Sequence, residues 1–202
     1  MNNVKLDEEN FLQTTMLPDE LIWRDTVFDT AWNLHPAKRH VVKIFGRLVE
    51  VPRWQQAYGA TYRYTGSSND ALPVPLEFVA LLTHVQQEID DRLNGILLNW
   101  YEGGDDYIGP HHDDTRDLVE DTPIVTVSYG EARKFRLTRG KGKEKFTVDQ
   151  VADVGRVFVM PWGTNLAWKH SVPKSKRYSG RRISVTFRAF SGGVLDEAAY
   201  FA

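Results

Sequence analysis

Within the segment 181–188, polar and apolar residues alternate from Arg182 to Arg188, and this pattern restricts the fold more than any other. One face carries Arg182, Ser184, Thr186 and Arg188, and the other face is apolar. Such alternation is typical of a half-buried β-strand, because successive side chains point to opposite faces. The two arginines lie six residues apart, so their Cα atoms are about 20 Å apart along a strand. We expect this face to be either a basic edge exposed to solvent or a wall that binds a short dicarboxylate.

Further strands and two helices are expected around this segment. Helices are predicted over 18–32 and 75–93, the second with a continuous apolar stripe and Gly95 at its end. A loop is expected at 33–40 and a polar turn at 67–71. Strands are predicted at 41–45, 96–101, 124–129, 134–138, 145–148, 156–160 and 181–190. Helices first and many strands afterwards predict a mainly β, α+β fold with helices packed on one side.

The composition is that of an ordinary globular domain. The chain has 202 residues, 42% of them hydrophobic and 26% charged, which fits one domain with a substantial core. No apolar run reaches the length of a membrane span, and the acidic N-terminus has no signal-peptide pattern. Cysteine is absent, which excludes disulfide and thiolate chemistry. We expect a monomeric, cytoplasmic protein, or a nuclear one if the source is eukaryotic, without a membrane partner.

Two histidines and an aspartate have the spacing of a metal site. His111 and Asp113 lie two residues apart, so on one strand they point to the same side, and His170 follows much later. Two imidazoles and one carboxylate can occupy one face of iron(II) and leave the opposite face open. The pair His112 and Asp114 has the same spacing, so spacing alone does not choose between the pairs. A solvated acidic loop is the other interpretation of this stretch.

A second strand also has a polar face. In the segment 97–101, Asn99 and Tyr101 share one side, and Leu98 and Trp100 share the other. An amide and a phenol directed into a β-barrel suit hydrogen bonding to a carboxylate or keto oxygen. The alternative is that Tyr101 only half-buries its ring. Together with the arginines of 181–188, the first interpretation is the stronger one.

These motifs in combination resemble the AlkB family of iron(II)- and 2-oxoglutarate-dependent dioxygenases, which demethylate nucleic-acid bases. The similarity covers roughly residues 40 to 190 and is strongest toward the branch of the human nuclear DNA-repair homologues. It is carried by 45–47, 52–59, 99–101, 108–114, 170–173 and 182–188. The resemblance implies a double-stranded β-helix, or jelly roll. It also implies a division of the single domain into N-terminal helices with a nucleotide-recognition lid (1–95) and a catalytic core (96–190).

The resemblance implies a role for each site residue. It favours His111, Asp113 and His170 as iron(II) ligands over the shifted pair. It assigns 2-oxoglutarate, which reacts together with O₂, to the positions Asn99, Tyr101, Arg182, Thr186 and Arg188. Substrate contacts are expected from Phe45, Gly46, Arg47 and Tyr58 in the segment that resembles the lid, and from Asp114. An enzyme that acts on a base must extract it from the stack and hold it, which suits aromatic side chains there.

The distribution of charge suggests a nucleic-acid partner. The net charge is only −2, but 13 of the 25 Lys and Arg lie within 133–145 and 169–182. Such clusters can contact successive phosphates of a nucleic-acid backbone. The other interpretation is that they form an exposed turn whose charges only keep it soluble. The resemblance implies oxidative demethylation of 1-methyladenine and 3-methylcytosine in DNA. An RNA demethylase and an oxygenase acting on a protein or small molecule are the alternatives. Acidic residues near Asp113, Asp114 among them, suit a cationic base.

Overall fold

The structure is a computed structural model that describes residues 1–44, 46–64 and 67–192. Its main element is an eight-stranded sheet, antiparallel except for its β5–β8 pair. The strand order is β1 (Asn2–Lys5), β2 (Phe11–Met16), β14 (Arg156–Met160), β11 (Ile124–Gly130), β16 (Arg182–Arg188), β9 (Gly95–Tyr101), β5 (Trp54–Tyr58) and β8 (Ala71–Leu72). The alternating segment 181–188 therefore forms a central strand, and β16 is buried on both faces.

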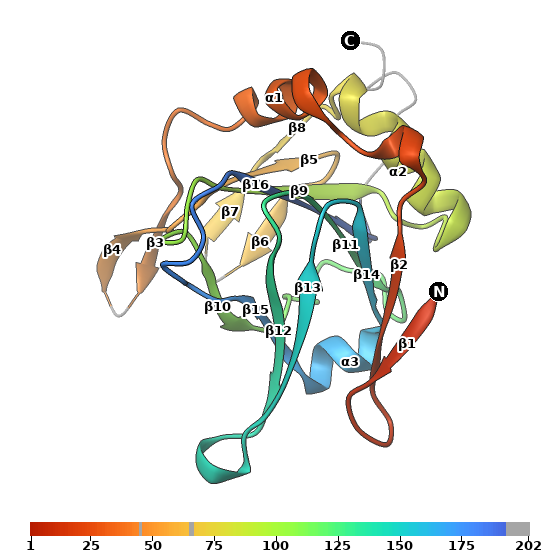
Figure 1. The fold of residues 1–202 in the computed structure, drawn as a ribbon, viewed down its shortest axis with the longest axis vertical. Coiled ribbons are helices and arrows are strands. Elements are labelled where there is room, and N and C mark those ends of the chain that lie inside the picture. Colours follow the sequence, from red (N-terminus) through yellow and green to blue (C-terminus); the bar gives the residue numbers. More distant parts are fainter. Residues whose placement is uncertain (45, 65–66, 193–202) are drawn as a thin grey trace.

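A four-stranded antiparallel sheet lies against the polar face of the large sheet. Its order is β10 (Ile108–His111), β15 (Lys169–Val172), β12 (Arg133–Arg139) and β13 (Phe146–Ala152). The β12–β13 hairpin extends away from the body of the molecule, with the 3-10 turn Gly142–Glu144 at its tip (Figure 1). Two more hairpins, β3 (Val41–Ile44) with β4 (Arg47–Glu50) and β6 (Tyr62–Tyr64) with β7 (Ser67–Asn69), each form a separate two-stranded sheet.

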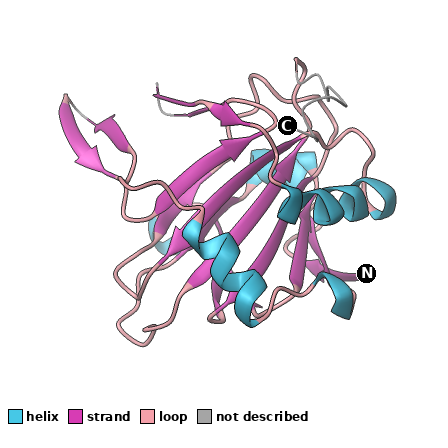
Figure 2. Ribbon diagram, turned by 90° about the horizontal axis from the view of Figure 1, so that it is seen from above, coloured by secondary structure: helices cyan, strands magenta, loops and turns pink. Residues whose placement is uncertain are grey.

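Two helices, α1 (Asp25–Asn33) and α2 (Leu76–Glu88), pack on the other face of the large sheet (Figures 1 and 2). The apolar stripe of α2 is confirmed, because Phe78, Leu81, Leu82 and Val85 are buried in one cluster with the apolar side of β16. A short helix, α3 (Trp162–Ala167), precedes β15. No helix in the described ranges combines the length and apolarity needed to cross a bilayer. The mainly β prediction with helices on one side is confirmed.

Several local predictions need correction. The expected helix over 18–32 is broken into a 3-10 turn at Asp19–Leu21 and α1, and Asp25, the first residue of α1, has a positive φ of 44°. The expected polar turn at 67–71 contains β7 and the start of β8. Strand β1 was not predicted, because its sequence is mostly polar and its side chains are mostly exposed. The large sheet also includes β1, β2, β5 and β8 from the N-terminal part of the chain.

Candidate metal and cosubstrate site

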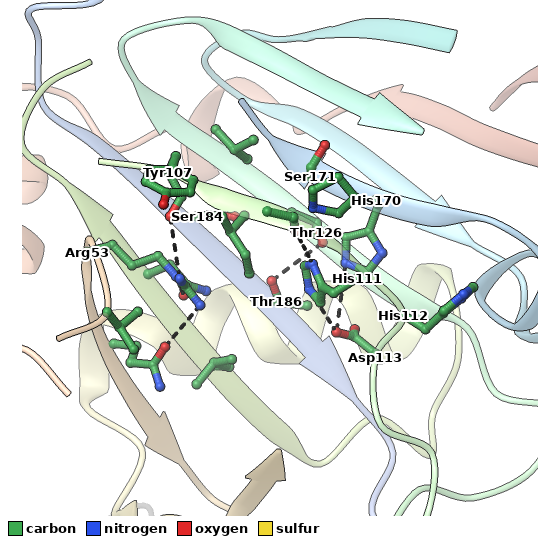
Figure 3. A pocket seen from close by; sticks show the side chains of 18 of the residues that line it. Arg53, Tyr107, His111, His112, Asp113, Thr126, His170, Ser171, Ser184 and Thr186 are labelled. Atoms are coloured by element: carbon green, nitrogen blue, oxygen red, sulfur yellow. Dashed lines mark hydrogen bonds and ion pairs between the residues drawn. The ribbon is translucent and has the colours of Figure 1, made fainter. Parts of the chain in front are cut away.

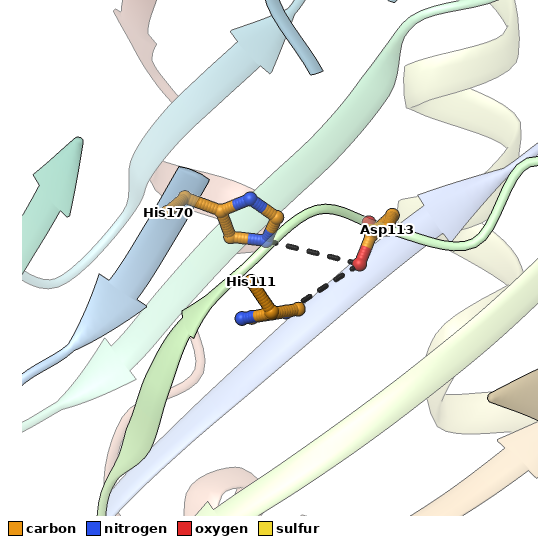
Figure 4. A group of neighbouring side chains, drawn as sticks. All are labelled: His111, Asp113 and His170. Carbon is orange, nitrogen blue, oxygen red and sulfur yellow. Dashed lines mark ion pairs between the residues drawn. The ribbon is translucent and has the colours of Figure 1, made fainter. Parts of the chain in front are cut away.

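Three side chains converge at one end of the small sheet. His111 on β10 and His170 on β15 are direct cross-strand partners, and their ring centroids lie 4.2 Å apart. Oδ1 of Asp113 lies 3.6 Å from Nε2 of His111 and 3.8 Å from Nε2 of His170 (Figure 4). One ligand atom from each residue lies within 4.8 Å of the others. Because their metal-binding atoms face a common point, these residues can hold one ion.

The structure separates the two overlapping His-Asp pairs. His112 turns away from the group formed by His111, Asp113 and His170 (Figure 3), and its Nδ1 lies 2.5 Å from the backbone oxygen of Asn165. Asp114 accepts hydrogen bonds from Arg116 instead of approaching a histidine. The described part of the chain therefore brings together the first pair and not the shifted pair.

Asp113 is not held by a strand, although the spacing argument assumed one. β10 ends at His111, and Asp113 lies in the irregular segment that follows. Asn165 of α3 replaces the missing strand contacts: its Oδ1 accepts a hydrogen bond from the backbone NH of Asp113 at 2.9 Å, and its Nδ2 donates to the Asp113 carbonyl at 3.2 Å. Asn165 is fully buried. Sequence reasoning missed this residue because nothing in a lone asparagine after a glycine-containing segment points to such a contact.

Arg188 neutralises the carboxylate of Asp113. Its Nε and Nη2 donate to Oδ2 at 3.0 and 2.7 Å, and both side chains are buried. Burial alone would raise the pKa of Asp113, but the Arg188 guanidinium and the two histidines hold that pKa well below its ordinary value. Asp113 is thus ionised, as a metal ligand must be, and Oδ1 remains directed toward the histidines.

His170 is also prepared as a neutral ligand. Burial, and then the charge of His111, lower the pKa of His170 to about 3, so its imidazole is neutral at neutral pH. Nδ1 of His111 lies 2.9 Å from the backbone oxygen of Gly109. A proton on that Nδ1 would leave the Nε2 lone pair for a metal, which is the usual arrangement of a ligating histidine.

A cavity of about 840 Å³ opens between the two sheets beside these residues (Figure 3). Asn99, Tyr101, Thr186 and Arg188 line it, as do the three candidate ligands. The predicted cosubstrate residues of β9 and β16 therefore share one cavity with the candidate metal ligands, because both polar faces point to the same side of the sheet. The cavity is large enough for 2-oxoglutarate and a further group.

Arg182 lies behind the cavity wall. Its side chain is fully buried, with the guanidinium carbon 5.1 Å from the centre of the Tyr101 ring, and Nη2 donates to Oγ of Ser128 at 2.9 Å. Nε and Nη1 are buried without a hydrogen-bond partner among the described residues. Burial lowers the pKa of Arg182. A buried guanidinium with two unused donors fits a carboxylate, so this residue can bind the distal end of a dicarboxylate.

The predicted substrate residues have different surroundings. Phe45 lies outside the described residues. Gly46 has a positive φ of 80° and joins β3 to β4, where Arg47 is exposed. Tyr58 is buried in the core against Phe78 and does not line the cavity. Asp114 does line the cavity.

Some polar side chains of the cavity were not predicted as site residues. Arg53, Gln55, Tyr62 and Tyr107 all line the cavity. The Tyr62 hydroxyl lies 3.4 Å from Oδ1 of Asp113, and the Arg188 guanidinium lies over its ring. The strands around Tyr62 are too short to show a recognisable periodicity in the sequence. For Arg53 and Gln55 the sequence contains only a weak signal, namely their alternation with residues 54 and 56.

The basic clusters are only partly available to phosphate. Arg133 and Arg182 are fully buried, and Arg133 donates to the backbone oxygens of Gly103 and Asp106. Arg136 pairs with Asp149, and Arg139 pairs with Asp7. The exposed lysines of the two clusters are Lys134, Lys141, Lys143, Lys145, Lys169, Lys174 and Lys176, and of these Lys134 pairs with Asp149 and Lys174 pairs with Asp105. The prediction that the clusters contact phosphates therefore applies to their exposed side chains and not to Arg133 or Arg182.

Comparison with known proteins identifies the superfamily. The profile of the 2OG-Fe(II) oxygenase superfamily matches residues 28–188. The chain is 37% identical over 160 residues to the mouse "DNA oxidative demethylase ALKBH2", covering 73% of this chain and 65% of that protein. It is 30% identical over 203 residues to the Arabidopsis thaliana protein of the same name, covering 85% and 63%. The chain thus spans less than two thirds of the length of either relative.

A solved structure supports the fold. The structure of OsALKBH1 matches with a TM-score of 0.59 and 14% identity, over 93% of this chain and 99% of that one. At this identity the likeness concerns the fold alone, and it confirms the predicted jelly roll. The superfamily match includes His111, Asp113, His170 and both β16 arginines. The chain therefore belongs to the 2OG-Fe(II) oxygenase superfamily and, within it, to the AlkB family.

Proposed function

We propose that this protein is an iron(II)- and 2-oxoglutarate-dependent dioxygenase that demethylates N-alkylated bases in DNA. The observation that carries the proposal is the single cavity shared by the candidate triad and the polar faces of β9 and β16. A binding module would have no reason to bury Arg182 with two unused donors beside that cavity. The ALKBH2 relatives are named DNA oxidative demethylases, which supports DNA as the substrate.

Each residue has a defined part in this proposal. His111, Asp113 and His170 hold iron(II), and Arg188 keeps Asp113 ionised. Arg182 binds the distal carboxylate of 2-oxoglutarate, while Asn99, Tyr101 and Thr186 orient the molecule by hydrogen bonding. Bound iron supplies the oxidation that couples decarboxylation of 2-oxoglutarate by O₂ to hydroxylation of an N-methyl group. The hydroxymethyl group then leaves the base as formaldehyde.

The protein supplies orientation and an enclosed site. Apolar side chains of the cavity, such as Leu97, Phe135 and Val172, limit the access of water to the reacting atoms. A base has to leave its stack to reach the metal end of the cavity. Arg47 is exposed on the hairpin of 41–50, and Val42 and Val49 of that hairpin line the cavity, which supports a role for the hairpin where a nucleotide enters.

Asp114 is the proposed contact for the charge of the base. It lines the cavity, and the methylated bases 1-methyladenine and 3-methylcytosine are cations. Arg116 offsets part of its charge, since three hydrogen bonds join that exposed guanidinium to the Asp114 carboxylate. We therefore expect only a modest preference for cationic lesions. Asp114→Asn should reduce activity on these lesions more than on neutral 1-methylguanine.

The test is incubation with 2-oxoglutarate, iron(II) and matched substrates, with formaldehyde as the readout. The substrates are 1-methyladenine in a DNA oligonucleotide, the same lesion in RNA, and a methylated peptide. Formaldehyde from DNA in excess over RNA supports the proposal. Turnover of RNA alone would identify an RNA demethylase, and turnover of the peptide alone would identify a protein oxygenase.

A further inference from the structure

Arg53 is a buried cation in the cavity for which the proposed reaction has no role so far. It lies just before β5, has only 7% of its surface exposed and lines the cavity. No carboxylate lies within ion-pair distance of it among the described residues. Its hydrogen bonds go instead to neutral groups: Nε donates to Oδ1 of Asn99 at 2.7 Å, Nη2 donates to Oε1 of Gln55 at 3.1 Å, and Nη1 donates to the backbone oxygen of Tyr107 at 3.5 Å.

The sheet explains why these three side chains meet. Gln55 on β5 and Asn99 on β9 are direct partners in the antiparallel ladder, so their side chains emerge side by side on one face. Arg53 precedes Gln55 by two residues and projects to that same face. Its planar guanidinium is therefore bonded to two neighbouring amides at once (Figure 3 shows Arg53 within the cavity).

These bonds determine the orientation of the Asn99 amide. A guanidinium N–H can only donate, so the amide atom that faces Nε of Arg53 has to be the oxygen. The amide nitrogen of Asn99 is then the group left to donate a hydrogen bond. The reversed amide would place two donors against each other and would offer an acceptor to a carboxylate, which is an unfavourable pairing.

We propose that Arg53 is a positioning residue for 2-oxoglutarate, which acts by holding Oδ1 of Asn99 so that Nδ2 donates to an oxygen of the cosubstrate. This inference rests on the proposed function, because that function places 2-oxoglutarate beside Asn99. Lysine cannot replace Arg53 in this role, since a single ammonium group lacks the fixed fork that bonds Asn99 and Gln55 together. Arg53 also adds positive charge to a cavity that receives a dianion.

A double-mutant cycle separates positioning from simple charge. The measurement is the dissociation constant of 2-oxoglutarate, by calorimetry on protein loaded with Mn(II) in place of iron(II), so that no turnover occurs. Four proteins form the cycle: wild type, Arg53→Met, Asn99→Ala and the double variant. We expect Arg53→Met to weaken binding about tenfold in wild type and less than about twofold in the Asn99→Ala background.

Matched variants keep this test decisive. Arg53→Lys preserves the charge, and we expect most of the loss to remain, again only when Asn99 is present. Arg39→Met is the control: that arginine stacks on Trp54 and pairs with Asp106, and its loss should change binding less than about twofold. If Arg53→Met does not fold, as judged by circular dichroism, the Arg53→Lys cycle decides.

The outcomes distinguish the two proposals. If Arg53→Met weakens 2-oxoglutarate binding equally with and without Asn99, the positioning role is wrong. Arg53 would then act through its charge alone or as a structural residue. Equal losses in the Arg53→Lys cycle would also show that the positioning role is wrong. If wild-type protein loaded with Mn(II) does not bind 2-oxoglutarate at all, the proposed function itself fails, and the role of Arg53 fails with it.

Discussion

Arg188 donates two hydrogen bonds to a single carboxylate oxygen of Asp113, at 3.0 and 2.7 Å, with both side chains almost entirely buried. Oδ2 of Asp113 is thus occupied by Arg188, whereas Oδ1 faces His111 and His170. This single contact connects the strand that carries the arginines to the candidate metal centre. Arg188 is therefore already paired before any dicarboxylate binds, whereas Nε and Nη1 of Arg182 have no hydrogen-bond partner among the described residues.

The first prediction concerns Asp113 and the stability of the fold. Asp113→Ala should remove metal binding and also lower the free energy of unfolding of the metal-free protein by about 3–5 kcal/mol, because it leaves Arg188 buried and unpaired. Denaturant unfolding in the presence of a chelator measures this. Asp113→Ala should be less destabilising when combined with Arg188→Met. A loss of stability that is unchanged in the double variant would contradict the pairing argument.

The histidine pair gives a control for this experiment. His111→Ala and His170→Ala should each abolish metal-dependent turnover. His112→Ala should keep most of it, since His112 contacts the Asn165 backbone instead of the candidate metal position. An inactive His112→Ala variant with an active His111→Ala variant would show that the choice between the overlapping pairs is wrong.

The second prediction concerns Arg182 and the cosubstrate. Arg182→Met should weaken 2-oxoglutarate binding by about tenfold or more, because it removes a charge-assisted contact to the distal carboxylate. Pyruvate has the same keto acid group without that carboxylate, so its weaker binding should be almost unaffected. Titration of both ligands with Mn(II)-loaded protein gives the comparison. Equal losses for the two ligands would show that Arg182 does not contact the distal carboxylate.

Much of this site could be predicted from the sequence, for identifiable reasons. Alternation in 181–188 and 97–101 fixed which side chains share a face, and the structure brings Asn99, Thr186 and Arg188 to one cavity. Contacts made by loops and short helices left no comparable signal. Asn165 and Tyr62 approach Asp113 only through the tertiary fold. Tyr58 shows the opposite error, since a position in the expected lid segment says little about which face of β5 points to the core.

The basic segment 133–145 shows a second limit. Counting charges cannot separate Arg133, buried against backbone carbonyls, from the lysines at the exposed hairpin tip. Ion pairs between distant segments also reduce the positive charge that is available to phosphates, as Asp7 of the N-terminal hairpin does for Arg139. Both effects depend on pairing between segments distant in the chain, which charge patterning does not reveal.

The third prediction concerns the hairpin tip and DNA. Lys141, Lys143 and Lys145 are exposed there, and replacing all three by Gln should reduce the dependence of DNA binding on salt by about 2–3 counterions. The measurement is the slope of log binding constant against log salt for an undamaged oligonucleotide. Arg133→Gln is unsuited as a comparison because that residue is buried, so Lys5→Gln serves as the exposed control. An unchanged slope in the triple variant would remove the hairpin from the DNA-binding surface.

The fourth prediction concerns pH. The folded-state pKa of His170 is about 3, below its ordinary value of 6.5, so the unfolded chain binds this proton more readily than the folded chain. The free energy of unfolding of metal-free protein should therefore fall as pH is lowered from 6.5 toward 3, by up to about 1.4 kcal/mol per pH unit. His170→Asn should flatten the pH dependence between 6.5 and 5, where carboxylates contribute less. An equally steep profile in that variant would assign the dependence to other groups.

The most direct test of the account is mass spectrometry of a DNA oligonucleotide containing one 1-methyladenine, after incubation with the protein, iron(II), 2-oxoglutarate and air. We predict that the oligonucleotide loses the mass of one CH₂ unit, because hydrogen replaces the methyl group. We also predict that formaldehyde and succinate appear together, and that the reaction stops when iron(II) or 2-oxoglutarate is omitted. His170→Ala should be inactive in the same assay. Demethylation that persists without 2-oxoglutarate, or succinate formation with no change in any methylated DNA, RNA or peptide, would contradict the account.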